Sequence, residues 1–289
     1  MFVSQTQNLS SGDADRPAMA SARTKIAIAG MGAIGVAVAK AVSNGEVPGI
    51  VVTAVAARDA AKCRRILDEI GCDAAIESID TLHRHADIVI ECAPANLLDR
   101  IVRPVVSAGK AVIVLSVGAL LSHFDLIDLA RQHGGRIIIP TGALLGLDAV
   151  AAAAQGKIHS VTMTTRKPIQ GLLGAPYLSE HNIDISEIKA PLRIFEGTAR
   201  QAAVGFPANL NVAVALALAG IGPDLTRLEI WADPGVTRNT HRIVVDADSA
   251  RLDMTIENVP SENPKTGRIT ALSVISTLKK INAPLCVGC

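Results

Sequence analysis

Aromatic residues are scarce in this sequence, at 2% of 289 residues, although 49% of the residues are hydrophobic. The core must therefore be built from Ala, Val, Ile and Leu, a composition typical of parallel sheets whose buried strands are continuous aliphatic runs. Few aromatic side chains argue against base-stacking surfaces. A net charge of +1 argues against electrostatic binding to nucleic acid or to an acidic membrane, so we expect neither partner.

Long hydrophobic runs are missing too, since no apolar stretch reaches the roughly 18 residues that a membrane-spanning helix needs. Residues 1–23 have no apolar segment of the kind found in secretory signals, and we expect a disordered tail there. The five Cys are odd in number, and we expect reduced thiols in a cytoplasmic protein. His and Cys are scattered without ligand spacing, so no metal site is expected.

Aliphatic runs alternate with amphipathic helical segments in the first half of the chain. The predicted helices are Ala33–Ser43, Ala60–Ile70, Leu97–Ala108 and Ser122–His133. The predicted strands are Lys25–Ala29, Ile50–Ala57, Asp87–Cys92, Ala111–Leu115 and Arg136–Ile139. This alternation predicts an α/β fold with a Rossmann-type, doubly wound parallel sheet.

The pattern changes after Pro140 and predicts a second, α+β domain with a mostly antiparallel sheet. Its predicted helices are Leu147–Ala154 and Thr198–Ala219, the second interrupted around Phe206-Pro207, with a long loop over 168–190. Its predicted strands are Ile158–Lys167, Arg227–Ala232, His241–Asp246 and Arg251–Glu257, the last two forming a hairpin. We therefore expect a dinucleotide-binding domain over 24–141, a substrate and dimerisation domain over 142–264, and a C-terminal helix within 265–289 that returns to the first domain.

A glycine-rich turn, Gly30-Met31-Gly32-Ala33-Ile34-Gly35, follows the first predicted strand and opens the first helix. In this setting a GxGxxG predicts a dinucleotide site. Gly30 permits the tight turn, Gly32 lets the backbone approach the pyrophosphate, and Gly35 lets helix and strand pack closely. The backbone N–H groups of Ala33 and Ile34 lie at the positive end of the helix, where an anion binds.

The end of the second predicted strand indicates which dinucleotide binds. An Asp or Glu there would hold the ribose 2′-OH of NAD, but the sequence has Ala57-Arg58-Asp59. Arg58 suits a 2′-phosphate, which favours NADP or the use of both cofactors, with a solvated Arg58 and NAD as the alternative. Asp59 either serves the ribose or, as we favour, caps the helix that begins at Ala60. The turns Ala93-Pro94 and Ser116-Val117-Gly118 follow strands and are expected to border the nicotinamide.

Three polar stretches in the second half carry a resemblance to a known family. They are Phe206-Pro207-Ala208-Asn209-Leu210-Asn211, the segment from Ala232 to His241, and the segment from Glu257 to Thr266. Together with the segment from Thr141 to Asp148 they resemble the L-aspartate dehydrogenases, from about Lys25 to Val287. The resemblance implies an active-site His at His241 and cofactor contacts at Asn211 and Leu145. Leu145 departs from the Ala of the family and would crowd a contact that needs a small side chain.

The resemblance implies oxidative deamination of L-aspartate to oxaloacetate and ammonia through an imine, or the reverse amination, in a homodimer. A His fits this chemistry because its ordinary pKa near 6.5 lets it move protons in both directions. Candidates for holding the two substrate carboxylates are Arg166, Lys167, Arg238 and Lys265, which the sequence does not rank. Asn239 is a candidate hydrogen-bond partner that orients His241.

Two alternatives stay open from the sequence. A homoserine-dehydrogenase-like or dihydrodipicolinate-reductase-like enzyme would share the glycine-rich turn, because a Rossmann unit names a cofactor and not a reaction. A dinucleotide-sensing protein without catalysis would bind NAD(P) and have no need of His241.

Overall fold

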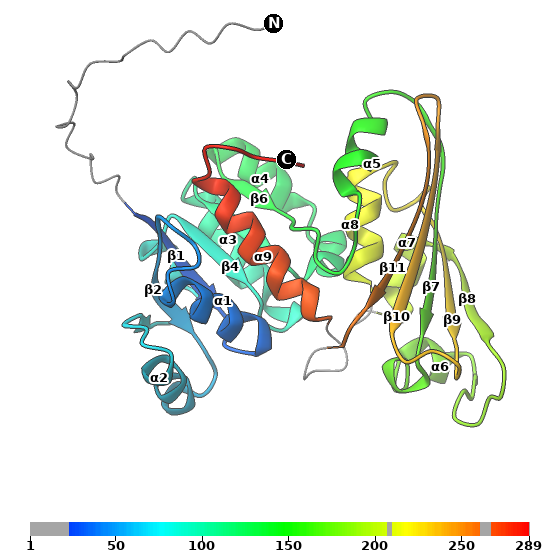
Figure 1. The fold of residues 1–289 in the computed structure, drawn as a ribbon, viewed down its shortest axis with the longest axis horizontal. Helices are drawn as coiled ribbons and strands as arrows, with labels where there is room; N and C mark the ends of the chain where they lie inside the picture. Colours follow the sequence, from blue (N-terminus) through cyan, green and yellow to red (C-terminus); the bar gives the residue numbers. More distant parts are fainter. Residues whose placement is uncertain (1–22, 207–209, 261–266, 289) are drawn as a thin grey trace, which may run out of the picture.

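The computed structural model describes residues 23–206, 210–260 and 267–288. It contains two β-sheets that lie side by side, each with helices packed against it (Figure 1). The predicted disordered tail, residues 1–23, lies outside the described residues except for Arg23.

The first sheet has six parallel strands in the order β3-β2-β1-β4-β5-β6. The strands are β1 Thr24–Ala29, β2 Ile50–Ala56, β3 Ala75–Ile76, β4 Ile88–Glu91, β5 Ala111–Val114 and β6 Arg136–Ile138. This is the strand order of the Rossmann fold, in which ligands bind beyond the carboxyl ends of the strands where the order reverses. The predicted fold class is therefore confirmed, and that reversal lies between β1 and β4.

Helices cover both faces of the first sheet because its strands are aliphatic on both sides. Ile26 and Ile28 of β1 pack with α1 (Ala33–Ser43), α2 (Ala60–Glu69) and α9 (Arg268–Ile281). Ala27 and Ala29 face the side of α3 (Leu98–Ser107) and α4 (Asp125–His133). Val274 and Leu278 of α9 are fully buried, so the last helix packs beside α1 on the first sheet.

The second sheet has five strands in the order β11-β10-β7-β9-β8. They are β7 Ile158–Lys167, β8 Leu192–Thr198, β9 Arg227–Ala232, β10 Asn239–Ala247 and β11 Arg251–Asn258. Every pair is antiparallel except β7 with β9, and β10 and β11 form the predicted hairpin. The prediction of a mostly antiparallel second sheet is thus confirmed.

Three helices, α5 (Leu147–Ala153), α7 (Ala199–Gly205) and α8 (Asn211–Ala219), pack against the second sheet. Apart from Asn211, α8 is entirely apolar, as expected of a helix enclosed on all sides. It also contacts the 3₁₀ turn Val117–Ser122 that follows β5, so α8 joins the two sheets (Figure 1).

Two predictions for the second half were wrong in part. Strand β8 was missed, because its residues Leu192–Thr198 follow a polar stretch and show no regular alternation; Thr198 ends this strand and caps α7 rather than lying in a helix. The predicted loop over 168–190 contains a 3₁₀ turn, Ile169–Gly171, and a short helix, α6, Pro176–Glu180. Helix α6 packs through Tyr177 against Phe195 and Phe206, contacts between residues distant in sequence that local patterns do not reveal.

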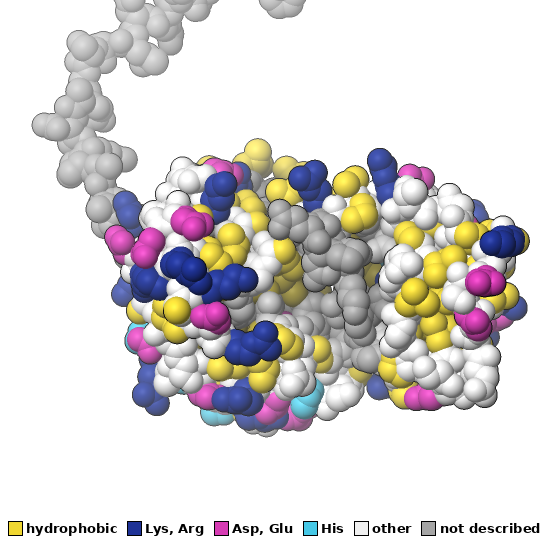
Figure 2. All heavy atoms as spheres, turned by 90° about the horizontal axis from the view of Figure 1, so that it is seen from below, with side chains coloured by type: hydrophobic (Ala, Val, Ile, Leu, Met, Phe, Trp, Pro, Cys, Tyr) yellow, Lys and Arg dark blue, Asp and Glu magenta, His cyan; other side chains and the backbone are white. Residues whose placement is uncertain are grey.

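The surface mixes charges of both signs. Figure 2 shows Lys and Arg side chains among Asp and Glu side chains over the first sheet and its helices. An example is the pair Arg64–Asp68 on α2, with N and O atoms 3.7 Å apart. Within the described residues, no helix is long and apolar enough to cross a membrane.

Candidate active site

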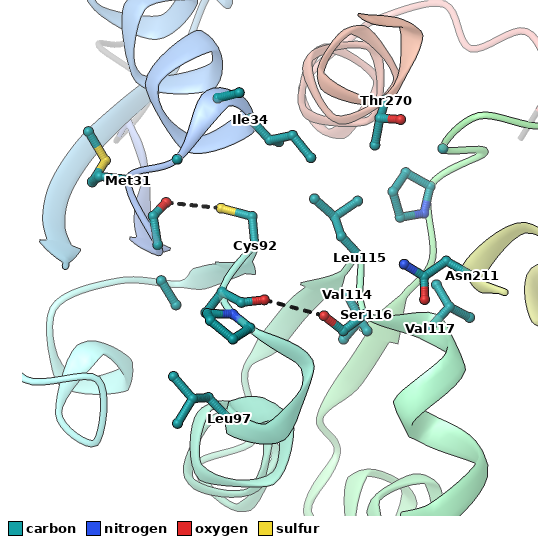
Figure 3. A pocket seen from close by; sticks show the side chains of 18 of the residues that line it. Met31, Ile34, Cys92, Leu97, Val114, Leu115, Ser116, Val117, Asn211 and Thr270 are labelled. Carbon is teal, nitrogen blue, oxygen red and sulfur yellow. Dashed lines mark hydrogen bonds between the residues drawn. The ribbon is translucent and has the colours of Figure 1, made fainter. Parts of the chain in front are cut away.

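A cavity of about 990 Å³ lies between the carboxyl ends of the first sheet's strands and one end of the second sheet. Segments from both sheets and from α9 line it, and Figure 3 shows part of this lining. Such a position is the expected one for a ligand of a Rossmann-type sheet. Lining segments include 29–34, 56–59, 92–94, 114–117, 140–143 and several residues of the second sheet.

The glycine-rich turn has the geometry that the sequence predicts. Gly30 has a φ of +107°, and a Cβ there would lie 2.6 Å from the carbonyl oxygen of Cys92. A Cβ on Gly35 would lie 2.0 Å from the carbonyl oxygen of Gly30, so Gly35 permits close packing beneath the turn. Gly32, Ala33 and Ile34 line the cavity at the start of α1, where no side chain caps the helix. The backbone N–H groups at the start of α1 are therefore placed to bind an anion.

Cys92 fixes the glycine-rich turn to the end of β4. Its Sγ donates to the carbonyl oxygen of Gly30 at 3.2 Å, the dashed bond in Figure 3. Burial, with the nearby charge of Glu91 as the smaller cause, raises the pKa of the Cys92 thiol. A protonated Cys92 is thus a structural donor and not a nucleophile.

Arg58 lines the cavity at the end of β2, where its side chain is exposed. Within the described residues it forms no ion pair. Lys62, one turn into α2, lines the same edge. The carboxylate of Asp59 accepts from the backbone N–H of Lys62 at 2.9 Å, which confirms that Asp59 caps α2. The guanidinium group of Arg58 at this edge is the cation that a 2′-phosphate would need.

The two turns expected to border the nicotinamide meet at the opposite end of the cavity. Ala93, Pro94, Ser116 and Val117 all line it. A residue that sequence reasoning missed, Glu91, lies beneath them and is fully buried. Its carboxylate accepts hydrogen bonds from both turns. A single acidic residue ending an otherwise aliphatic strand was the signal that could have identified it.

Asn211 is the first residue of α8 and lies beside Val117 in Figure 3. Its Oδ1 accepts from the backbone N–H of Gly118 at 3.0 Å. Because this bond uses the oxygen, the Nδ2 group is the donor that Asn211 can offer to a ligand in the cavity that it lines. The predicted cofactor-contacting Asn is thus at the same end of the cavity as the turns.

His241 is 3% exposed and lies on β10, directly opposite Thr165 of β7. Its Nδ1 is 3.1 Å from the Thr165 hydroxyl, which can donate or accept and so fits either ring tautomer. Burial, with the positive charge of Lys167 as the smaller cause, lowers the pKa of His241 to about 3. His241 is therefore neutral at pH 7. Its ordinary pKa led us to expect titration near neutrality, and that expectation was wrong.

Four polar side chains share one face of the second sheet at its cavity end. Since side chains alternate along strands and directly paired residues share a face, Lys167, Asn239, His241 and Asn258 point to the same side. All four line the cavity. Lys167 is 5% exposed, and burial lowers its pKa to about 8, so the ammonium is mostly charged at pH 7. Asn258 was not predicted; its Nδ2 donates to the carbonyl oxygen of Ala143 at 2.9 Å.

Three other sequence candidates, Leu145, Arg166 and Arg238, do not line the cavity. Leu145 packs against the apolar core, and Ala143 is the lining residue at this junction. Arg166 points to the opposite face of β7, where it pairs with Asp233 at 3.3 Å and lies over Trp231. Arg238 is half exposed, with Glu257 4.0 Å away. Lys265 lies outside the described residues. Of the four candidate carboxylate ligands, Lys167 alone lines the cavity within the described part of the chain.

The donor set of the cavity suits a dinucleotide and an acidic organic substrate. Within the described residues, no group of three His, Cys, Asp or Glu side chains is placed to hold a metal ion. The glycine-rich turn and Arg58 line the cavity from the first sheet, Asn211 lines it from α8, and His241 and Lys167 line it from the second sheet.

Comparisons with protein families divide the chain in the same way. Residues 30–140 match the family described as homoserine dehydrogenase, NAD binding domain. Residues 148–281 match the family described as aspartate dehydrogenase, C-terminal. The first half therefore belongs to a cofactor-binding unit shared between enzymes, and the second half carries the more specific likeness. The chain thus has an NAD-binding domain of the dehydrogenases.

Solved structures support the fold. An aspartate dehydrogenase from Thermotoga maritima superposes with a TM-score of 0.70 at 20% identity, covering 91% of this chain and 99% of that chain. A scyllo-inositol dehydrogenase from Lactobacillus casei gives a TM-score of 0.52 at 17% identity, covering 90% and 88%. At these sequence identities the structural similarity shows a shared fold and does not show a shared function.

Sequence relatives are much closer. An L-aspartate dehydrogenase of Bradyrhizobium diazoefficiens is 61% identical over 269 residues, which cover 93% of this chain and 95% of the relative. L-aspartate dehydrogenase 3 of Bordetella bronchiseptica is 57% identical, covering 91% and 97%. An L-aspartate dehydrogenase of Methanosarcina acetivorans is 39% identical, covering 91% and 99%. With relatives this similar over nearly its whole length, the chain belongs to the L-aspartate dehydrogenase family.

Proposed function

We propose that this protein is an NAD(P)-dependent L-aspartate dehydrogenase, which converts L-aspartate and water to oxaloacetate and ammonia through iminoaspartate, and runs the reverse amination. The observation that carries the proposal is the position of His241 and Lys167, which face the same cavity as the glycine-rich turn from the opposite sheet. A proton-transferring group and a cation are thus held across from the place for the dinucleotide.

We further propose that the chain forms two domains, each built on one of the two sheets. Residues 24–141, together with the last helix after Lys265, would form the dinucleotide-binding domain, and residues 142–264 the substrate domain. The packing of α9 beside α1 and the lining of the cavity by both sheets support this division.

The bound cofactor supplies the hydride acceptor for the substrate Cα, a task that no side chain performs. The protein must move protons both before and after that transfer, because the imine forms only from a deprotonated amine. In the tautomer that carries the proton on Nδ1 and donates it to Thr165, the other ring nitrogen of neutral His241 can accept a proton from the substrate ammonium. Once that proton has passed to solvent, the same nitrogen takes a proton from the water that adds to the imine carbon, and it then gives this proton to the departing amine. In the reverse direction these transfers run backwards, and the imidazolium donates.

Lys167 is the group that we assign to a substrate carboxylate. It is a buried cation beside His241, and a carboxylate brought next to it would gain an attraction only weakly screened by water. Asn239, on the same face, is assigned to hydrogen bonding with the substrate or His241. Arg166 and Arg238 are assigned no contact with substrate, because neither lines the cavity.

We propose NADP, or the use of both cofactors, from the environment of Arg58. The strand end carries no acid for the 2′-OH of NAD, since Asp59 caps α2, whereas Arg58 and Lys62 form a cationic edge. Replacing Arg58 with Ala should raise the KM for NADPH roughly tenfold or more and leave the KM for NADH within about twofold. Equal effects on both cofactors would contradict the assignment.

The decisive experiment follows oxidation of NADH or NADPH by absorbance, with oxaloacetate and ammonia, for wild type and His241→Ala. Turnover by the wild type and a loss of about 100-fold or more in the variant are expected, the range of general acid–base catalysis. Homoserine serves as the competing substrate. Turnover of homoserine but not of aspartate would replace the proposed substrate, and cofactor binding without any turnover would favour a dinucleotide sensor.

We also propose a homodimer formed through the outer face of the second sheet. That face, opposite the cavity face, carries Arg166, Trp231, Arg242 and Val244, which are exposed or half-buried. Light scattering after size-exclusion chromatography should give twice the chain mass of 30.0 kDa. A monomer would contradict the proposal.

A further inference from the structure

One buried carboxylate joins the two turns at the end of the cavity. Glu91 is the last residue of β4 and has no exposed surface. Its Oε2 accepts from the backbone N–H groups of Leu115 at 3.1 Å and Ser116 at 2.9 Å. Its Oε1 accepts from the Ser116 hydroxyl at 2.9 Å and from the backbone N–H of Ala93 at 3.2 Å. The turns after β4 and β5 are thus held together by a single side chain.

The hydrogen bonds indicate that Glu91 is ionised. Each oxygen has two donors, and three of the four are backbone N–H groups, which cannot accept in return. A proton on Oε2 would displace one of them, and a proton on Oε1 would require the Ser116 hydroxyl to give up its bond to Glu91. The pKa of Glu91 lies above its ordinary value, because burial raises it by more than the bonds from Ser116, Leu115 and Ala93 lower it. Within the described residues no cation pairs with Glu91, so dipoles alone balance its charge.

The turns that Glu91 holds are those that line the cavity. Ala93 and Ser116 border it, and the chain continues from Ser116 to Gly118, whose N–H binds Asn211. On the other side, Cys92 follows Glu91 directly and binds the glycine-rich turn. Glu91 is therefore at the centre of the contacts that shape the end of the cavity assigned to the nicotinamide.

We propose that Glu91 is a positioning residue that organises the nicotinamide end of the cavity, and that its negative charge favours the oxidised cofactor over the reduced one. This inference rests on the proposed function. The oxidised nicotinamide ring carries a positive charge, which hydride transfer removes. If the charge acted over about 10 Å at an effective dielectric constant of about 20, the ratio of the two dissociation constants would change roughly tenfold.

Glu91→Gln removes the charge and keeps most of the hydrogen bonds. The Gln carbonyl can accept from the N–H groups of Leu115 and Ser116, and its NH₂ can donate to the Ser116 hydroxyl. That hydroxyl can turn to the carbonyl oxygen of Ala93, 3.4 Å away and dashed in Figure 3. Only the N–H of Ala93 loses its partner, so the variant is expected to fold. Ser116→Ala is the matched control, because it removes one bond and keeps the charge.

The experiment measures the dissociation constants of the oxidised and reduced cofactor by isothermal titration calorimetry, using whichever of NAD and NADP binds the wild type more tightly. In Glu91→Gln the oxidised form should lose affinity roughly tenfold relative to the reduced form. In Ser116→Ala both forms should weaken together, with a ratio within about twofold of the wild type. If Glu91→Gln does not fold, Glu91→Asp replaces it, and the retained charge should preserve the ratio.

An unchanged ratio in Glu91→Gln would overturn the proposal, and so would a shifted ratio in Ser116→Ala or Glu91→Asp. Wild-type protein that binds neither form of either cofactor would overturn it as well. Failure of the proposed function appears differently, since the titrations contain no aspartate. Wild type that binds the cofactor but does not oxidise aspartate would refute the reaction and leave the role of Glu91 open to the same titrations.

Discussion

Replacing Lys167 with Met should stabilise the protein while it abolishes activity. Lys167 is 5% exposed, and burial lowers its pKa from 10.5 to about 8. At pH 7 the ammonium is charged in the folded and the unfolded states, so folding includes the cost of removing the charge from water. A shift of about 2.5 pKa units corresponds to about 3 kcal/mol. Met has a similar length and no charge, so at pH 7 the free energy of unfolding of the variant should be higher by up to that amount.

The pH dependence identifies the cause. Because the folded pKa lies below the unfolded one, the unfolded state binds more protons between about pH 8 and 10.5, and the stability contributed by Lys167 rises with pH over that window. It is fully present above 10.5 and lost as the pH falls to 8. The stability difference between Lys167→Met and wild type should therefore be largest at pH 7 and shrink towards pH 10.

Chemical denaturation of both proteins at pH 7 and pH 10 gives the free energies of unfolding, and Lys40→Met provides the control. Lys40 is exposed on α1, so its replacement should change stability by less than about 0.5 kcal/mol at either pH. A Lys167→Met protein that is less stable than wild type at pH 7, or a difference that does not depend on pH, would refute the reasoning. Retained aspartate turnover would refute the assignment of Lys167 to the substrate carboxylate.

Three further predictions concern the glycine-rich turn, α8 and β10. Gly35→Ala should prevent cofactor binding and lower the melting temperature by several degrees, since its Cβ would lie 2.0 Å from the carbonyl oxygen of Gly30; unchanged NAD(P) titrations would contradict this. Asn211→Ala should raise the cofactor KM about tenfold, because Gly118 loses its acceptor and the cavity a donor, and steady-state kinetics that show no change would exclude this role. As the pH falls from 6.5 towards 3, the free energy of unfolding should decrease less in His241→Asn than in the wild type. The reason is that His241 has a pKa of about 3 in the folded protein, whereas the unfolded chain takes up a proton on His241 in this pH range. Equal decreases in acid denaturation would contradict a buried neutral ring.

The first sheet was predictable because its information is local. Each strand is a short aliphatic run, each helix has one apolar stripe, and the glycine-rich turn has a spacing that few other structures require. Strand β3 was missed, since two residues cannot show a period. In the second sheet, β7 and β9 were predicted with their exact ends, because buried and half-buried residues alternate along them. Strand β8 has two consecutive buried residues, Ile194 and Phe195, at a register shift, so its period is broken.

The candidate site was predictable where a residue type is tied to a local turn, and not where it depends on strand pairing. Arg58 could be identified from its position after a strand. Lys167 and Arg166 are neighbours in sequence and equal as cations, but they point to opposite faces of β7. Only the register with β10 determines which of them lies beside His241. Glu91 and Asn258 were missed because a buried polar residue in a strand gains its meaning from partners far along the chain.

The cation beside His241 links substrate binding to proton transfer. The charge of Lys167 helps to keep His241 neutral, so the ring can accept a proton but holds it weakly. An L-aspartate molecule brings two carboxylates into this low-dielectric space. Their negative charge balances Lys167 and favours the imidazolium, so the pKa of His241 should rise towards the range in which protons move at neutral pH. A substrate with one carboxylate would provide less of this compensation, and we therefore expect the second carboxylate to affect kcat as well as KM.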